Sequence, residues 1–311
     1  MKHVFGPVPS RRLGYSLGLD AIPAKVCTMD CVYCELGPTT DRTVCRKEWV
    51  DVDAILRDLE ARIADGVRVD TVTLSGSGEP TLNDHLGELI DGARRLSDRP
   101  VAVLTNSSLM TDDAVCSALM RADIVAPSLD AVTPQLFERI NRPHPSLDVA
   151  AIERGVREFT AAFAGQVLLE IVFVRGMNDA PSEVERLAES VASIDPDVVH
   201  VNTVVRPPAV EGIEGLTAGE LDRVAGHLGP RAEVIARPRL GTQSASGETV
   251  DALVEMASRR PVTMEDIVSA LGVSRPEAAK IVGDLIDRGL LELVRHDEKR
   301  YYCSRPERGR Q

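Results

Sequence analysis

The sequence predicts an α/β fold built on a parallel sheet, followed by a small winged helix-turn-helix. Between about residues 70 and 240, short β-branched runs alternate with longer amphipathic stretches. Strands separated by helices in this way pair in parallel, and the helices cover the sheet. Beyond this region the pattern changes to short helical stretches followed by a hairpin. We therefore expect a first domain over residues 1–240, a linker over 241–249 and a second domain over 250–311.

Five apolar runs are the expected strands: Thr71–Leu74, Val101–Thr105, Ile124–Ala126, Val167–Val174 and Val198–Val205. The fourth reads VLLEIVFV, and such a continuous run is typical of a strand covered on both faces. The expected helices are Leu82–Leu96, Asp112–Arg121, Pro134–Ile140, Val149–Phe163 and Ser182–Ile194. Thr111 and Ser182 stand where N-caps belong, and Pro134 follows Thr133 as a first-turn proline should.

The end of the chain reads as a separate unit. Residues 241–249, GTQSASGET, are small and polar, which is typical of a linker. Thr263 can cap a short helix, and Ser274-Arg275-Pro276-Glu277 is a capping-box pattern that opens another. Leu290–Val294 and Tyr301–Cys303 flank a polar turn, as the strands of a hairpin do. Helices followed by a hairpin predict the winged helix.

Composition limits the partners. The net charge is −12, all of it carried by residues 1–249, and residues 250–311 are neutral. Neither part has the basic excess of a strong phosphate binder, so nucleic acid would need a local patch, such as Arg11 and Arg12, which otherwise form a solvated corner. No run of about 18 apolar residues and no signal peptide is present, so we expect a cytoplasmic protein without a membrane partner. Aromatic residues make up 3%, too few for a single-strand stacking platform.

Cys27, Cys31 and Cys34 form a C-x3-C-x2-C motif that can hold one metal centre. A four-iron cubane cluster takes four cysteines when it is fully ligated by protein. Three cysteines leave one iron free to bind something else. Zinc and inert thiols are the alternatives, but structural zinc sites want four ligands. The remaining cysteines are scattered and are expected to be ordinary buried residues: Cys45, Cys116 and Cys303.

A glycine-rich turn, Ser75-Gly76-Ser77-Gly78-Glu79-Pro80, follows the first expected strand. Its glycines allow a sharp bend and a close approach to a ligand, and Glu79 could accept from an ammonium group. The turn lacks both the dinucleotide G-x-G-x-x-G pattern and the P-loop G-K-[ST]. Other polar residues also follow expected strands, at the rim where α/β folds build sites: Asn106, Ser128, Asp130, Arg175–Asn178 and Arg206.

The cysteine motif, Tyr33 before its third cysteine, and the Gly76–Pro80 turn together resemble the radical S-adenosylmethionine (SAM) superfamily over roughly residues 3–245. The opening FGPVPSRRLGYSLGLD and the stretch SLDAVTPQLFERINRPHP are similar to the branch near the tRNA wyosine-forming enzymes. The resemblance implies a partial (β/α)6 barrel of the TIM-like type. It also implies an enzyme, since members cleave SAM reductively and use the 5′-deoxyadenosyl radical to abstract hydrogen.

The resemblance further implies a set of site residues. Cys27, Cys31 and Cys34 would hold a [4Fe–4S] cluster, and SAM would chelate its open iron. Within the Gly76-Ser77-Gly78-Glu79 turn, both glycines and Glu79 would bind the methionyl ammonium, and Tyr33 would lie near the adenine. Three residues fall where SAM carboxylate and ribose ligands usually sit, although such residues also cap helices: Asn106, Ser128 and Asp130. A ferredoxin or flavodoxin would donate the electron.

The substrate is not evident from these residues. Wyosine-forming enzymes carry a second cluster on upstream cysteines, and no cysteine precedes Cys27 here. Lys25 is either a catalytic amine or a surface lysine. The winged helix could dock tRNA or DNA, recognise a peptide or mediate dimerisation, and its helix over Arg275–Arg288 has balanced charge. The alternative function is a non-enzymatic iron–sulfur sensor that binds nucleic acid, which would need no Gly-Glu-Pro turn.

Overall fold

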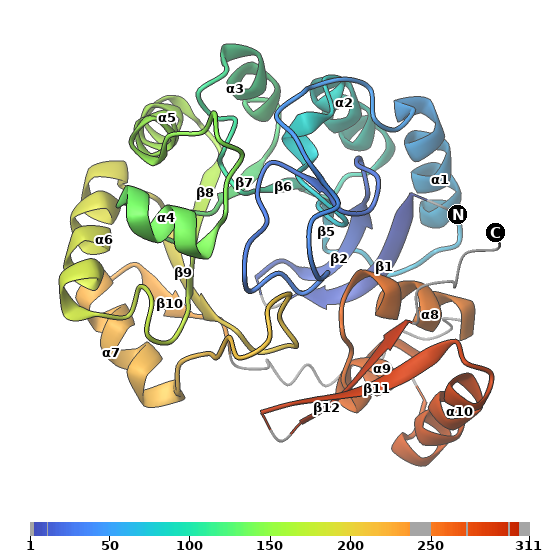
Figure 1. Cartoon of the computed structure of the whole chain (residues 1–311). Helices are drawn as coiled ribbons and strands as arrows, with labels where there is room; N and C mark the ends of the chain where they lie inside the picture. The colour runs from blue at the N-terminus through green and yellow to red at the C-terminus, as the bar shows by residue number, and fades with distance from the viewer. Residues whose placement is uncertain (1–2, 11, 237–249, 272, 298, 305–311) are drawn as a thin grey trace.

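The computed structural model describes residues 3–10, 12–236, 250–271, 273–297 and 299–304. An eight-stranded sheet forms the centre of the molecule, and helices line its outer side (Figure 1). Its strands, in sheet order, are β1 (Val4–Ser10), β2 (Gly14–Leu19), β5 (Thr71–Leu74), β6 (Val101–Thr105), β7 (Ile124–Pro127), β8 (Gln166–Phe173), β9 (Val198–Thr203) and β10 (Ala232–Val234). The helical segments of this part are α1 (Val52–Ala64), η1 (Pro80–Leu82), α2 (Leu86–Leu96), α3 (Asp113–Leu119), α4 (Pro134–Ile140), α5 (Val149–Ala162), α6 (Pro181–Ile194) and α7 (Ala218–Leu228).

The strands from β2 to β10 are all parallel, and only β1 pairs antiparallel, with β2. The sheet is open between β1 and β10 and curves as a partial barrel, with helices outside it (Figure 1). This confirms the α/β fold, and all five expected strands occur. The sequence reasoning missed the β1–β2 hairpin and β10. A further short parallel pair, β3 (Val26–Cys27) and β4 (Asp41–Arg42), brackets the cysteine motif.

The expected helix starts are only partly right. Pro134 opens α4 as predicted. The N-cap of α3 is Asp112 rather than Thr111, because the Asp112 carboxylate accepts a 2.8 Å bond from a first-turn amide. Ser182 does not cap α6, which begins one residue earlier at Pro181, where the fixed proline φ already suits a helix. The helix expected over 82–96 is split, and only its second part is α-helical.

The C-terminal winged helix is confirmed. It comprises α8 (Val250–Arg259), α9 (Met264–Leu271), α10 (Arg275–Asp287), β11 (Leu291–His296) and β12 (Lys299–Ser304). Thr263 caps α9, because its hydroxyl accepts from the Asp266 amide at 3.1 Å. The Asp266 carboxylate in turn accepts from the Thr263 amide at 3.0 Å. Ser274 caps α10 by accepting from the Glu277 amide at 3.4 Å. The expected linker, residues 241–249, lies outside the described residues.

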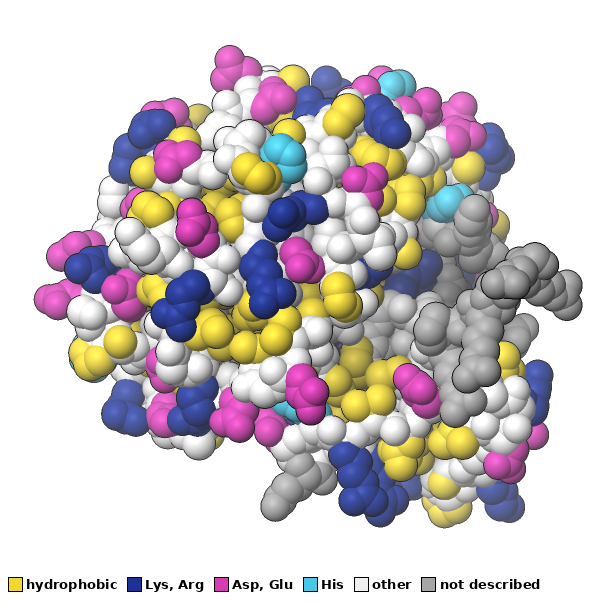
Figure 2. All heavy atoms as spheres, viewed as in Figure 1, with side chains coloured by type: hydrophobic (Ala, Val, Ile, Leu, Met, Phe, Trp, Pro, Cys, Tyr) yellow, Lys and Arg dark blue, Asp and Glu magenta, His cyan; other side chains and the backbone are white. Residues whose placement is uncertain are grey.

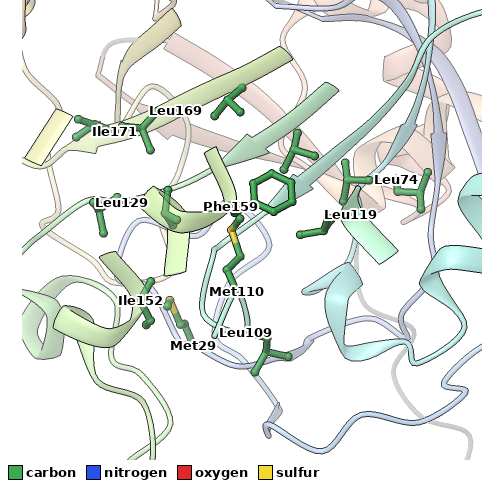
Figure 3. Close-up of a cluster of buried hydrophobic side chains, with 14 of the residues drawn as sticks. Met29, Leu74, Leu109, Met110, Leu119, Leu129, Ile152, Phe159, Leu169 and Ile171 are labelled. Atoms are coloured by element: carbon green, nitrogen blue, oxygen red, sulfur yellow. The ribbon is translucent and has the colours of Figure 1, made fainter. Parts of the chain in front are cut away.

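The described chain has two large hydrophobic cores and a third, small cluster of Leu13, Ala102, Ala126 and Leu168. The larger fills the space between the sheet and α1–α7, and Figure 3 shows part of it. Met29, from within the cysteine motif, lies in that cluster with Leu109, Met110 and Ile152. The smaller core belongs to the winged helix. No helix in the described part of the chain is long and apolar enough to cross a membrane.

The winged-helix core predicts a local stability effect. Leu285 in α10 is fully buried, and Leu285→Ala should cost about 2–5 kcal/mol because it leaves a cavity. Urea unfolding followed by far-UV circular dichroism would show the helical loss, while fluorescence of the single tryptophan, Trp49, reports the barrel. The exposed neighbour Lys280→Ala is the control, with an expected change within about 0.5 kcal/mol. Equal stability of the two variants would contradict the assignment of Leu285 to a core.

Candidate metal and cofactor site

The cysteine motif is a loop anchored by the residues between its cysteines. Cys27, Cys31 and Cys34 are half-buried, whereas Met29 and Val32 are each 2% exposed and reach into the main core. Buried apolar side chains thus alternate with the sulfur-bearing ones, so core packing fixes the loop.

The end of α4 holds the same loop through backbone bonds. The Val32 amide donates to Ile140 O at 2.9 Å, and the His144 amide donates to Thr28 O at 2.9 Å. Further bonds run from the Asp30 amide to the carbonyls just after α4. The partners of the loop in these bonds, residues 140–144, lie in the stretch SLDAVTPQLFERINRPHP. Part of the family resemblance is therefore explained by backbone bonds that hold the cysteine loop.

A side-chain N–H group lies near each of the three sulfur atoms. The contacts are Asn106 Nδ2 to Cys27 Sγ at 3.5 Å, Asn141 Nδ2 to Cys31 Sγ at 3.5 Å, and Lys25 Nζ to Cys34 Sγ at 3.7 Å. Lys25 is half-buried with a left-handed φ of 66°, so it is not an ordinary surface lysine. Its Nζ also donates to Gly37 O.

Two thiols of the motif, Cys27 and Cys31, are costly to ionise. Burial, together with the negative charge of Glu79, raises the pKa of Cys27 to about 12. Burial and the Asp130 carboxylate raise the pKa of Cys31 well above its usual value. A bound metal ion offsets such a cost, because it takes the thiolate form. Within the described residues, no three His, Cys, Asp or Glu side chains converge as ligands of a single ion would; a polynuclear cluster instead gives each cysteine its own iron.

The glycine-rich turn lies directly against the start of the cysteine motif. A Cβ on Gly78 would stand 1.9 Å from Val26 O, so only glycine allows this approach. The Glu79 amide donates to Val26 O at 3.3 Å, and the Lys25 amide donates to Ser77 O at 2.7 Å. The turn and the cysteine loop are therefore one backbone unit.

The Glu79 carboxylate is buried and ties two strand ends together. Its Oε1 accepts from Thr81 N at 3.2 Å, from Thr81 Oγ1 at 2.6 Å and from Thr105 Oγ1 at 2.6 Å. Its Oε2 accepts from the Asn106 amide at 2.7 Å. Burial raises the pKa of Glu79, and these bonds oppose that rise. Three of these donors share Oε1 and one binds Oε2, so the group holds the turn to the end of β6 while Oε2 keeps a further acceptor site.

Asp130 is the second buried carboxylate beneath the site. Its Oδ1 accepts from the Val172 amide at 2.8 Å, and its Oδ2 accepts from Asn141 Nδ2 at 2.7 Å and from the Tyr33 hydroxyl. Burial raises the pKa of Asp130 to about 6, against the effect of these hydrogen bonds. Asp130 and Asn106, expected beside SAM, therefore have internal partners in this structure.

A cavity of about 1610 Å³ opens above these residues. Five of the expected site residues line it: Cys31, Cys34, Tyr33, Gly76 and Ser128. The others are Cys27, Ser77, Gly78, Glu79, Asn106 and Asp130, which support that surface from below or beside it. The cavity extends from the carboxyl ends of the strands to the winged helix, which supplies residues such as Met256 and Tyr301.

Two arginines join the winged helix to this rim. Arg259, the last residue of α8, lies 3.4 Å from the Asp20 carboxylate. Asp20 in turn accepts from Ser77 Oγ at 2.5 Å and from the Ser77 amide at 3.1 Å. Arg206, which follows β9, lies between Glu35 at 3.2 Å and Asp266 at 3.6 Å. The winged helix thus contacts Asp20, the anchor of the glycine-rich turn, directly, and it is linked to Glu35, the residue after Cys34, through Arg206.

The sequence reasoning did not identify several of these residues. Asp20 ends an alternating apolar run, GYSLGLD, which is a strand signal that could have found it. Asn141 follows a short helix and gives no such signal. Arg12 was expected at a solvated corner of the surface, but it pairs with Glu170 at the wall of the cavity. Arg11 lies outside the described residues.

The expectation for the remaining cysteines was only partly right. Cys45 is exposed, because it lies in the extended segment between β4 and α1 and makes only local contacts, for example from its amide to Thr43 Oγ1 at 3.0 Å. Cys116 and Cys303 are half-buried, and neither lies in the cysteine loop.

The sequence model of the radical SAM superfamily matches residues 21–191, which include the cysteine loop, the glycine-rich turn and the strands β5 to β8 of the sheet. The chain belongs to the radical SAM superfamily. Members of this superfamily are generally enzymes that use a [4Fe–4S] cluster and SAM. A MarR family model matches residues 246–300, in agreement with the winged helix.

Relatives of this radical SAM protein extend over nearly the whole chain. It is 30% identical to "UPF0026 protein MJ1312" of Methanocaldococcus jannaschii over 97% of this chain and 96% of that protein. It is also 30% identical to "GTPase Obg" of Brachyspira hyodysenteriae over 93% of this chain, but spans only 43% of that protein. No Gly-Lys pair occurs in the present sequence, so it has no P-loop.

Two solved structures share the fold. TYW1 with a bound lysine–pyruvate adduct superposes with a TM-score of 0.53 and 17% identity, covering 72% of this chain and 75% of that one. A radical SAM methyltransferase from Sphaerobacter thermophilus gives a TM-score of 0.52 and 17% identity, covering 70% and 65%. At this identity the likeness concerns the fold.

The contact between Gly78 and Val26 predicts a large effect for a single methyl group. Gly78→Ala places a Cβ against a backbone oxygen that cannot rotate away, so it should cost about 1–3 kcal/mol or more. Gly226→Ala is the matched control, because Gly226 lies in α7 with open space around it and alanine favours helix. Urea unfolding should show the first variant destabilised and the second unchanged or stabilised. If Gly78→Ala left the free energy of unfolding unchanged, that result would contradict the close approach of the turn to Val26 O.

The link through Asp20 predicts coupled mobility. In Arg259→Ala the winged helix loses one of its contacts with the rim, and Asp20 loses a partner that helps hold Ser77. Hydrogen–deuterium exchange followed by mass spectrometry should become faster in both α8 and residues 75–79. Arg275→Ala, which removes an exposed pair with Glu265, is the control and should change neither. Faster exchange confined to α8 would argue against the link.

Proposed function

We propose that this chain is a radical SAM enzyme in which Cys27, Cys31 and Cys34 hold a [4Fe–4S] cluster and the glycine-rich turn binds SAM. The observation that carries the proposal is the contact of Gly78 with Val26 O, which sets a superfamily-type turn beside the cysteine loop at the edge of one cavity. The donor set fits the cluster, because three thiols gather on one loop and the two whose pKa values burial raises, Cys27 and Cys31, need a cationic partner to ionise.

When bound, the cluster supplies one electron that cleaves SAM and yields a 5′-deoxyadenosyl radical able to abstract hydrogen from a substrate. The chain's own residues bind and orient. We infer that the backbone around Gly76, which lines the cavity, faces the methionyl group, while the buried Glu79 carboxylate holds the turn in place. Ser128 and Tyr33 line the adjoining wall. The electron would come from a small donor such as a ferredoxin or flavodoxin.

The winged helix forms one wall of this cavity, so a substrate would bind between it and the rim. Its MarR-type fold supports tRNA or DNA as a partner, and a peptide is the other candidate. Figure 2 shows basic and acidic side chains interspersed on the visible face, without a continuous basic surface. This favours a substrate group that enters the cavity over a long phosphate backbone lying across that face.

The second candidate function is an iron–sulfur sensor that reads nucleic acid through the winged helix, and the MarR family match favours it. A sensor needs a cluster but no SAM cleavage. The two functions therefore differ in one measurable product, 5′-deoxyadenosine.

The decisive experiment is anaerobic reconstitution with iron and sulfide, reduction by dithionite, and an assay for 5′-deoxyadenosine. The wild-type chain should hold a [4Fe–4S] cluster and form the product, and Cys31→Ala should lose both. Cys45→Ala, which removes an exposed cysteine outside the loop, should retain both. Retention of cluster or cleavage by Cys31→Ala would refute the ligand assignment. A full cluster without cleavage, across a range of candidate substrates, would favour the sensor.

A further inference from the structure

Each cysteine of the motif has its own side-chain N–H donor, and the three donors come from three different parts of the chain. Asn106 follows β6, Asn141 follows α4, and Lys25 precedes β3. Nothing in the local sequence groups these residues, since Asn106 and Asn141 lie far along the chain from the motif. Their arrangement around the sulfurs is produced by the fold alone.

The orientation of the Asn106 amide is fixed by its oxygen. Oδ1 accepts from the Ser108 amide at 3.1 Å and from Ser108 Oγ at 2.6 Å. Because both donors need an acceptor, the NH₂ group has to face the other way. There it donates to Thr28 Oγ1 at 2.8 Å and to Cys27 Sγ at 3.5 Å.

Asn141 is fixed from the nitrogen side. Its Nδ2 donates to the Asp130 carboxylate at 2.7 Å and to Cys31 Sγ at 3.5 Å. Its Oδ1 is buried without a hydrogen-bond partner among the described residues, which is unfavourable for folding. Stability alone therefore does not explain an asparagine at position 141. Its role as a donor between the Asp130 carboxylate and the Cys31 sulfur does explain it.

Lys25 reaches Cys34 from a constrained backbone. Its left-handed φ of 66° is uncommon for lysine, and the conformation is held by the 2.7 Å bond from its amide to Ser77 O. The side chain then spans from Gly37 O to Cys34 Sγ. An ammonium group is thereby held beside the sulfur that has no asparagine donor.

We propose that Asn106, Asn141 and Lys25 are positioning residues that set the reduction potential of the cluster held by Cys27, Cys31 and Cys34. This inference rests on the proposed cluster. On one-electron reduction the cluster gains a negative charge, which is shared by its sulfurs. N–H donors and a cation near those sulfurs stabilise the reduced form, so they raise the potential and ease reduction by the external donor.

The test uses the full chain, reconstituted anaerobically, and redox titration with dithionite and mediators followed by electron paramagnetic resonance, without SAM. Asn141→Leu removes the donor at Cys31, and Lys25→Met removes the donor and the charge at Cys34. Each should make reduction several-fold to about tenfold harder, a midpoint lower by up to about 59 mV for one electron. Lys25→Arg keeps the charge and the N–H donors, so its midpoint should lie close to that of the wild-type chain.

The control is Glu138→Gln, an exposed change in α4, the helix that Asn141 follows, which should leave the midpoint unchanged. Full clusters with wild-type potentials in both Asn141→Leu and Lys25→Met would overturn the inference. So would loss of the cluster in both, because the residues would then serve assembly rather than potential. If only one variant loses the cluster, the midpoint of the other decides. Failure of the wild-type chain to hold any cluster would instead overturn the proposed function.

Discussion

The rest of the site depends on one close contact, between Gly78 and the carbonyl oxygen of Val26. A side chain at position 78 would collide with that oxygen at 1.9 Å, so the glycine-rich turn can approach the cysteine loop this closely only with glycine at this position. Val26 O also accepts the Glu79 amide, and Ser77 O accepts the Lys25 amide. The two halves of the family motif, about 50 residues apart in sequence, thus form one small hydrogen-bonded unit.

Buried charge organises the surroundings of that unit. Glu79 and Asp130 lie beneath the rim, and each has hydrogen bonds to a neighbouring strand end. Burying a carboxylate is costly unless its oxygens have donors, and both residues have them. Their negative charges raise the pKa values of the nearby thiols. The architecture thus leaves negative charge where a cationic metal centre would be stabilised.

The sequence allowed much of the fold to be predicted, because its signals are local. The β-branched runs marked five strands, Pro134 marked a helix start, and the Ser274 pattern marked α10. Helix starts at Thr111 and Ser182 were wrong, because Asp112 and Pro181 compete at adjacent positions. Such one-residue choices depend on details that propensity does not resolve.

The candidate site could be predicted only where the motif itself is contiguous. The cysteines and the glycine-rich turn stood out by spacing, whereas Asn141 and Asp20 matter only through contacts made by folding. Asn106 and Asp130 were located correctly at strand ends, but their partners could not be foreseen from sequence.

The anchoring of the cysteine loop has a consequence for maturation. Met29 and Val32 tie the loop into the main core, and backbone bonds from the end of α4 hold its path. A zinc finger gains its fold from its metal, whereas here packing of the polypeptide shapes the loop. Under the proposed function, packing of the chain would set the path of the loop, so assembly of the cluster could follow translation and folding instead of accompanying them.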